Sequence, residues 1–187
     1  MTINFTANLI RQTNIPKLNE EGKYRPAKVS VVELDKNDNN DINALYKTYT
    51  DWKWQGAKYS KEIYEEAVKG YEYDQVLKEH YFAVTEQNNN FEKLDSSKIL
   101  GLMMYSETFE DADEIDWLQV RPKTNSIDSW NKEYKKVGKT LIDTIKNSIK
   151  DRTVHVTSAR NAIGFYKKQG FANRKEDKVA VSLYLEV

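Results

Sequence analysis

Hydrophobic and polar residues alternate at the end of this chain. Val179, Val181, Leu183, Leu185 and Val187 occupy every second position. Because successive side chains of a strand point to opposite faces, the alternation predicts a strand with one buried face. Further strands are predicted at residues 28–34, 81–84, 98–105, 114–120 and 153–157.

Other segments repeat their apolar residues at helical spacing. Four of them stand at i, i+3, i+4 and i+7: Ile42, Leu45, Tyr46 and Tyr49. This spacing places them on one face of a helix, and Asp41 just before them is typical of a helix N-cap. Two more helices are predicted by the apolar positions Ile63, Tyr64, Ala67, Val68 and Tyr71, and by Val137, Leu141, Ile145 and Ile149.

The segments follow one another as a strand, two helices, three strands, a helix, a strand, a short helix and one or two closing strands. This order predicts an α/β (mixed α+β) architecture in which helices cover the faces of a mixed sheet. Residues 1–25 are polar with weak periodicity, and we expect an N-terminal arm there. Residues 26–187 then form one domain, because a chain of 187 residues supports a single well-packed core.

Composition narrows the class of protein. The 29 basic residues balance the 29 acidic ones, so neither general nucleic-acid binding nor membrane binding is expected. The lack of cysteine excludes disulfides, thiolate metal sites and an acyl-cysteine intermediate. His80 and His155 lack metal-ligand spacing, so we expect no metal. A polar N-terminus and the lack of an apolar run of ~20 residues favour a cytoplasmic protein.

A glycine turn is the first motif that carries candidate chemistry. It reads Lys135-Lys136-Val137-Gly138-Lys139-Thr140 and opens an amphipathic helix. A helix N-terminus presents unpaired N–H groups and the positive end of the helix dipole, so it binds anions. Gly138 permits close approach because it has no side chain. With three lysines nearby, the turn suits a diphosphate; a plain helix start with solvated lysines is the alternative.

A short helix at residues 161–171 is the second motif. It reads Asn-Ala-Ile-Gly-Phe-Tyr-Lys-Lys-Gln-Gly-Phe. Gly170 suits the left-handed position that ends a helix, and Phe171 then begins a strand in the core. Taken by itself, Tyr166 is a packed aromatic residue, and its phenol, with an ordinary pKa of ~10, stays protonated at neutral pH.

Together the two motifs resemble the C-terminal half of the GCN5-related N-acetyltransferase (GNAT) superfamily, and the order of elements resembles that fold over roughly residues 28–187. The short helix fits the family pattern Ala-x-x-Phe/Leu-Tyr-x-x-x-Gly-Phe. The family's turn is Gln/Arg-x-x-Gly-x-Gly/Ala: Gly138 matches, whereas Lys135 and Thr140 replace the first and last positions. Ala159 stands where the family has an asparagine. The resemblance implies a central mixed, mostly antiparallel sheet that is splayed in the middle and flanked by about four helices.

The resemblance also implies an activity. Acetyl-coenzyme A would donate an acetyl group to a primary amine, directly within a ternary complex. The coenzyme's diphosphate would be bound by Lys135, Lys136, Val137, Gly138, Lys139 and Thr140. The pantetheine arm would be held by the backbone of Leu118, Gln119 and Val120, on a strand that separates from its neighbour after a bulge, and by Asn161.

The catalytic roles implied by the resemblance fall on three residues. Tyr166 would be the general acid that protonates the departing thiolate, and Asp116 or Glu114 would accept the amine's proton, directly or through water. Solvated charges at a strand end are the alternative for the two carboxylates. Strand parity places Glu114, Asp116, Leu118 and Val120 on one face of the strand, and Ile115, Trp117 and Gln119 on the other.

Other interpretations stay open. The departures at Lys135, Thr140 and Ala159 favour a non-catalytic GNAT-fold binding module with weak coenzyme binding. An acyltransferase acting on a protein or charged tRNA amine is a further alternative. The expected partner is a small-molecule or peptide amine acceptor, and the oligomeric state, a homodimer included, is open. Trp52 and Trp54 follow the first helix, where they either line an acceptor pocket or pack in the core or on the surface.

Overall fold

The computed structural model describes residues 6–70, 76–109, 112–122, 132–148, 152–176 and 180–186. Within them, eight strands form one sheet in the order β1-β2-β3-β4-β5-β6-β8-β7. The strands are β1 (Asn8–Leu18), β2 (Tyr24–Leu34), β3 (Val76–Thr85), β4 (Ile99–Thr108), β5 (Ala112–Val120), β6 (Thr153–Ala159), β7 (Ala172–Glu176) and β8 (Ala180–Glu186). Strands β5 and β6 are parallel, and the other neighbours are antiparallel.

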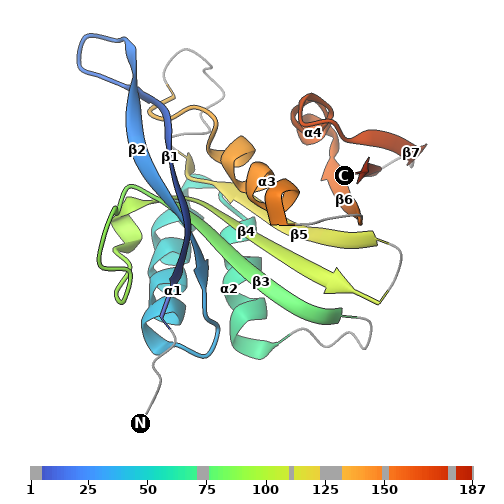
Figure 1. Ribbon diagram of the computed structural model, residues 1–187, viewed down its shortest axis with the longest axis horizontal. Helices are drawn as coiled ribbons and strands as arrows, with labels where there is room; N and C mark the ends of the chain where they lie inside the picture. The colour runs from blue at the N-terminus through green and yellow to red at the C-terminus, as the bar shows by residue number, and fades with distance from the viewer. Residues whose placement is uncertain are drawn as a thin grey trace.

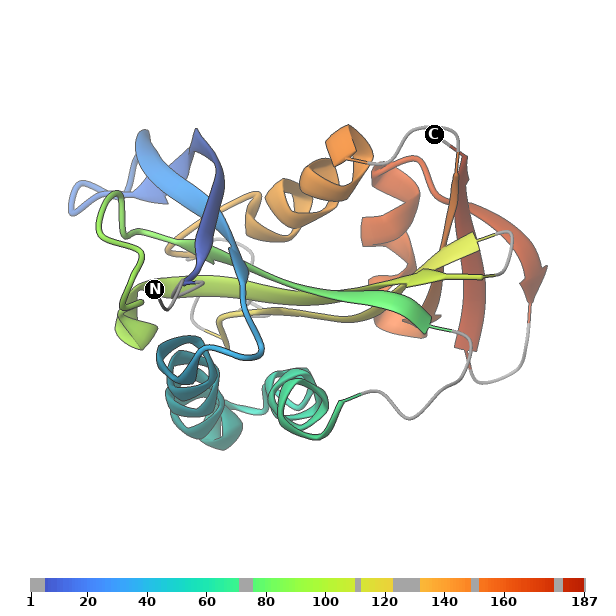
Figure 2. The ribbon, with the colours of Figure 1, turned by 60° about the horizontal axis from the view of Figure 1, so that its bottom comes forward.

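Helices cover both faces of this sheet. They are α1 (Asn39–Trp52), α2 (Tyr59–Lys69), α3 (Val137–Ser148) and α4 (Ile163–Lys168), with short 3-10 turns at η1 (Lys53–Gln55), η2 (Ser96–Lys98) and η4 (Arg160–Ala162). Helices α1 and α2 lie on one face and α3 on the other (Figures 1 and 2). The predicted mixed α+β fold, with a mostly antiparallel sheet and about four helices, is confirmed.

Two hydrophobic cores result, one on each face of the sheet. Met103 and Tyr105 of β4 pack with Leu141 on the α3 side. Leu102 and Met104 pack with the residues of α1 and α2 on the opposite side. The apolar run at residues 99–105 of β4 therefore reflects burial on both faces, because successive side chains of a strand alternate between them.

The N-terminal residues take part in the sheet. Residues 8–18 of the segment expected as an arm form β1, which pairs with β2 along most of its length. The expected boundary between residues 25 and 26 falls inside β2. At the other end of the chain, Val181, Leu183 and Leu185 of β8 are buried, as their alternation predicted. Val179, Val187 and Ile149 lie outside the described residues.

The predicted cap of the first helix was wrong. Helix α1 begins at Asn39, and the carboxylate of Asp38 caps it by accepting hydrogen bonds from the amides of Asn40 and Asp41. Asp41 is instead buried in the first turn, where its Oδ2 accepts a hydrogen bond from the amide of Asp35 at 2.9 Å. The helix starts before its first apolar residue, so the apolar spacing located its N-terminus too late.

Candidate functional site

The candidate site lies where β5 and β6 separate. These strands pair only between residues 112–114 and 153–155, although β5 continues to Val120 and β6 to Ala159. The gap between the diverging ends holds a cavity of about 880 Å³, and the divergence is visible in Figure 2. Beyond Glu114, the edge of β5 that would have paired with β6 is free of that partner.

A β-bulge at Asp116 lies just beyond the last paired residue, Glu114, where the two strands separate. Met104 pairs with Trp117, and the next residue, Tyr105, pairs with Ile115. Asp116 is thus an extra residue in β5, and such a residue bends and twists a strand. The bulge also overturns the predicted parity. Ile115 packs in the α3-side core together with Leu118, whereas Trp117 packs in the core beneath α1 and α2.

Most residues predicted for the site line this cavity. They are Tyr166, Asp116, Leu118, Gln119, Val120, Lys135, Lys136, Val137, Gly138, Lys139 and Asn161. Two predicted residues, Glu114 and Thr140, are not among the described residues that line it. Thr140 is buried in α3, and its hydroxyl donates to the carbonyl of Lys136 at 3.0 Å. Its β-branched side chain therefore does not narrow the approach to the turn.

The N-terminus of α3 forms one end of the cavity. The first hydrogen bond of the helix runs from the amide of Thr140 to the carbonyl of Lys136, at 2.9 Å, so the amides of Val137, Gly138 and Lys139 precede the helical ladder. Lys136 has a left-handed backbone with φ of 67°. Alternation of left- and right-handed residues turns successive N–H groups toward one point, which is an anion-binding arrangement.

The three lysines of the turn differ in their surroundings. The ammonium of Lys135 lies 3.7 Å from the centre of the Tyr24 ring, a cation–π contact. Lys139 pairs with Asp143 at 2.7 Å, one helical turn along α3. All three side chains are exposed, so they supply positive charge at the mouth of the cavity.

Tyr166 reaches the cavity from α4. It is buried in the α3-side core between Phe165 and Phe171, with ring centres 5.0 and 5.4 Å away. Gly170, with φ of 96°, is the left-handed residue that follows the helix, as predicted. Burial, and to a smaller extent the nearby phenol of Tyr59, raises the pKa of Tyr166 above that of a free phenol. Its hydroxyl therefore stays protonated at neutral pH.

The two candidate bases are placed differently. Asp116 lines the cavity, and its Oδ2 accepts a hydrogen bond from the Ser106 hydroxyl at 2.7 Å, which orients the carboxylate. Glu114 stands before the bulge, where its Oε1 lies 3.4 Å from His155 Nδ1. The structure thus brings Asp116 together with Tyr166 around one cavity and places Glu114 beside β6.

Another wall of the cavity comes from two residues near the start of α2 that the sequence patterns did not single out. Gly56 and Tyr59 line the cavity. The Tyr59 ring stacks on Trp117 at 5.3 Å, and its amide donates to Gln119 Oε1 at 3.3 Å. Trp52 is buried in the core, and Trp54 is 84% exposed. Neither tryptophan is among the lining residues, so Trp52 packs in the core and Trp54 lies on the surface.

Within the described ranges, no three His, Cys, Asp or Glu side chains are arranged to hold a metal ion. None of the described helices has the length and apolar character needed to cross a membrane.

Comparison with known proteins identifies the fold. No family model matches the chain, and no curated protein matches it. Among solved structures, Escherichia coli ElaA matches with a TM-score of 0.54 and 13% identity over 84% of this chain and 99% of its own. The E. coli ribosomal-protein-S18-alanine N-acetyltransferase matches with a TM-score of 0.52 and 13% identity over 85% and 94%.

A protein of Desulfovibrio desulfuricans, assigned to the GNAT family of acetyltransferases, matches with a TM-score of 0.50 and 15% identity over 84% of this chain and 98% of its own. Each alignment covers nearly the whole of the matched protein. Because the sequence identities are low, these matches show a shared fold and nothing further. The chain has the GNAT acetyltransferase fold, as its motifs predicted.

Proposed function

We propose that this protein is an acetyl-coenzyme A-dependent N-acetyltransferase that transfers the acetyl group directly to a primary amine within a ternary complex. The observation that carries the proposal is a single cavity that joins the N-terminus of α3 to Tyr166 and Asp116 through the gap between β5 and β6. An anion site, a free strand edge, a phenol and a carboxylate are thus arranged around one space.

The residues at the α3 end suit the coenzyme's diphosphate. The amides of Val137, Gly138 and Lys139 offer hydrogen bonds, and the charges of Lys135 and Lys136 add attraction. Bound there, acetyl-coenzyme A supplies an activated thioester. Thr140, buried away from the cavity, leaves this end open, which supports coenzyme binding over the weakly binding module that the substitution had suggested.

The edge of β5 suits the pantetheine arm. Among the described strands, β6 pairs with this edge only as far as Glu114, and an amide-containing chain of ligand pairs with such an edge as a strand would. Leu118, Gln119 and Val120 are the residues of this edge. Asn161, at the start of the α4 motif, lines the opposite side of the cavity.

Proton transfer is assigned to Asp116 and Tyr166. The attacking amine must lose a proton as its nitrogen bonds to the acetyl carbon, and Asp116 accepts that proton directly or through water. The carbon–sulfur bond breaks, and charge grows on sulfur. Because the pKa of Tyr166 is raised, complete proton transfer from the phenol to a thiolate of pKa ~8.5 is uphill. The phenol therefore acts first as a hydrogen-bond donor that stabilises the leaving sulfur.

The proposal is tested by acetyl transfer to a panel of amines. The panel contains free lysine, polyamines, aminoglycosides, peptides with free N-termini and aminoacyl-tRNA. Release of free thiol from acetyl-coenzyme A, with acetylation of the amine confirmed by mass spectrometry, is expected with at least one class. Tight coenzyme binding without transfer to any class would contradict the enzyme assignment and favour the binding module.

A further inference from the structure

The hairpin of β1 and β2 contacts the segment that leads into α3. The amide of Leu18 donates to the carbonyl of Glu133 at 2.8 Å, and the amide of Lys135 donates to the carbonyl of Pro16 at 2.9 Å. An antiparallel bridge joins Lys17 to Tyr134 between them. Residues 133–135 thus extend the free edge of β1 as a short additional strand, near the hairpin tip in Figure 1.

Three side chains stabilise this contact. The ammonium of Lys17 lies 2.9 Å from Glu86 Oε1, and the Tyr134 hydroxyl donates to the same carboxylate oxygen. Lys17 also lies 4.9 Å from the centre of the Tyr134 ring. Burial alone raises the pKa of Glu86, but its bonds to Tyr134 and Lys17 outweigh burial and lower the pKa. The three groups are from β1, the β3–β4 loop and the segment before α3.

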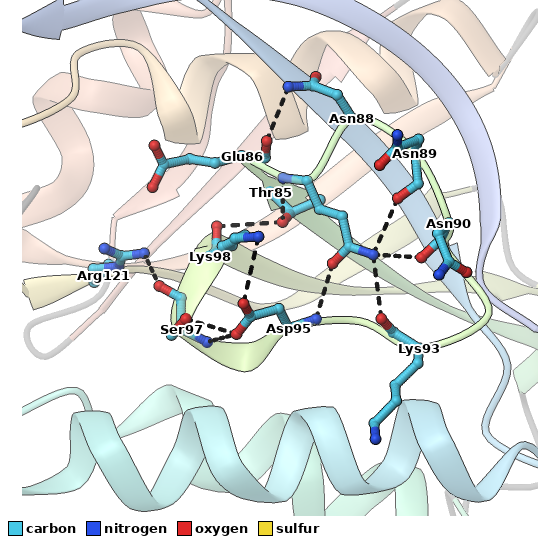
Figure 3. A network of polar contacts seen from close by, with 11 residues as sticks. Thr85, Glu86, Asn88, Asn89, Asn90, Lys93, Asp95, Ser97, Lys98 and Arg121 are labelled. Atoms are coloured by element: carbon cyan, nitrogen blue, oxygen red, sulfur yellow. Dashed lines mark hydrogen bonds and ion pairs between the residues drawn. The ribbon is translucent and has the colours of Figure 1, made fainter.

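The loop that carries Glu86 is itself fixed, as Figure 3 shows. The amide of Glu86 donates to the carbonyl of Lys98 at 3.0 Å, and its carbonyl accepts from the Asn88 side chain at 3.0 Å. The same loop binds the end of β5, since Arg121 Nη2 donates to the carbonyl of Ser97 at 2.7 Å. The loop therefore contacts two walls of the cavity, β5 and the segment before α3.

The hairpin also contacts cavity residues through Tyr24. Its hydroxyl donates to the carbonyl of Lys132 at 2.7 Å, and its ring lies under the ammonium of Lys135. Immediately afterwards, Lys136 holds a left-handed backbone, which is sterically costly for a residue other than glycine. A turn with this cost needs support from its surroundings, and the hairpin and the Glu86 loop supply it.

We infer that Lys17 and Glu86 are positioning residues: acting through Tyr134, they hold the turn before α3 in the geometry that binds the coenzyme's diphosphate. This inference rests on the proposed function. Neither side chain lines the cavity, so their effect on binding passes through the turn.

The test compares two ligands. Coenzyme A contains the diphosphate, whereas pantetheine lacks it. Dissociation constants are measured by calorimetry for coenzyme A and by NMR titration for pantetheine, on the wild type, Lys17→Met and Glu86→Gln. Lys36→Met is the matched control, because Lys36 is 40% exposed and pairs with Glu79 at 2.8 Å, while Lys17 is 41% exposed and pairs with Glu86 at 2.9 Å. Tyr134→Phe, which removes only a hydroxyl, is a milder variant.

In Lys17→Met and Glu86→Gln, we expect the affinity for coenzyme A to fall about tenfold, which equals about 1.4 kcal/mol. Pantetheine affinity stays at the wild-type value, and Lys36→Met changes neither ligand. Unchanged coenzyme A affinity in the variants overturns the inference and leaves the proposed function standing. An equal loss for both ligands also overturns it, because the network would then support the whole fold. If the wild type binds neither ligand, the proposed function fails first.

Discussion

The ring of Phe165 fills the space beside Gly138. A Cβ atom at position 138 would lie 3.1 Å from Phe165 Cζ and 3.3 Å from its Cε2. The first turn of α3 thus packs directly on α4, one residue away from Tyr166. A side chain at position 138 would crowd the contact of the two helices, which join the proposed diphosphate site to the proposed acid.

Gly138→Ala should weaken both stability and activity. The added methyl group pushes the Phe165 ring and α4 away, and overpacking of this kind costs about 1–3 kcal/mol. Thermal unfolding and coenzyme A affinity are the measurements. Gly164→Ala is the control, because a Cβ at that position on α4 meets nothing within 4 Å. A Gly138→Ala protein with wild-type stability and affinity would contradict the packing argument.

Tyr166→Phe should lower turnover by ~10²–10⁴-fold, because it removes the proposed hydrogen-bond donor to sulfur. Steady-state kinetics with acetyl-coenzyme A and the identified amine measure the change. Tyr81→Phe controls for loss of a buried hydroxyl, since Tyr81 is buried and donates to Glu79 at 2.9 Å in the core beneath α1 and α2. Equal activity of Tyr166→Phe and the wild type would remove the catalytic role.

Asp116→Asn should lower kcat/KM by ~10²-fold if this carboxylate accepts the amine's proton. The loss should shrink as pH rises, because more of the amine is then already unprotonated. Glu114→Gln is the comparison, since that side chain faces His155 outside the cavity, and it should have the smaller effect. A larger loss in Glu114→Gln than in Asp116→Asn would reverse the assignment.

Asp41 should give a pH-dependent stability unrelated to catalysis. Burial raises its pKa to about 7, and its Oδ1 has no hydrogen-bond partner among the residues that the structure describes. The folded state therefore binds a proton that the unfolded state releases near pH ~4, so stability falls as pH rises from about 4 to about 7 and is then level.

Asp41→Asn removes this slope, because the amide oxygen still accepts from the Asp35 amide and carries no charge. We expect the free energy of unfolding of the variant, relative to that of the wild type, to rise by on the order of 2 kcal/mol as the pH increases from 4.5 to 8. Urea unfolding at each pH measures it. Parallel stability curves for the two proteins over that range would show that Asp41 does not titrate as stated.

The strands and the short α4 motif could be predicted because their signals are local. Val181, Leu183 and Leu185 alternate, and the left-handed Gly170 follows its helix directly. The resemblance implied a bulge in this strand, but its position at Asp116 could not be predicted, because it appears only in the register between β4 and β5. Without it, strand parity assigned Ile115 to the wrong face.

The contribution of the hairpin to the site depends on long-range contacts. Lys17, Glu86 and Tyr134 are far apart in sequence, and each has an ordinary local pattern. Tyr59 is similar, because only the packing of α2 on β5 brings it against Trp117. A residue that acts through a distant partner does not produce a local sequence pattern. The sequence therefore identified the glycine turn and Tyr166, but not the residues that hold them in place.

The most direct test of the central claim is thermal unfolding with acetyl-coenzyme A. A ligand at ~100 times its dissociation constant stabilises a protein by ~2.7 kcal/mol, which corresponds to a rise in Tm of about 5–10 °C for a chain of this size. We predict that rise with acetyl-coenzyme A and a clearly smaller one with adenosine diphosphate, which lacks the arm for the β5 edge. No rise with acetyl-coenzyme A, or an equal rise with adenosine diphosphate, would contradict the account.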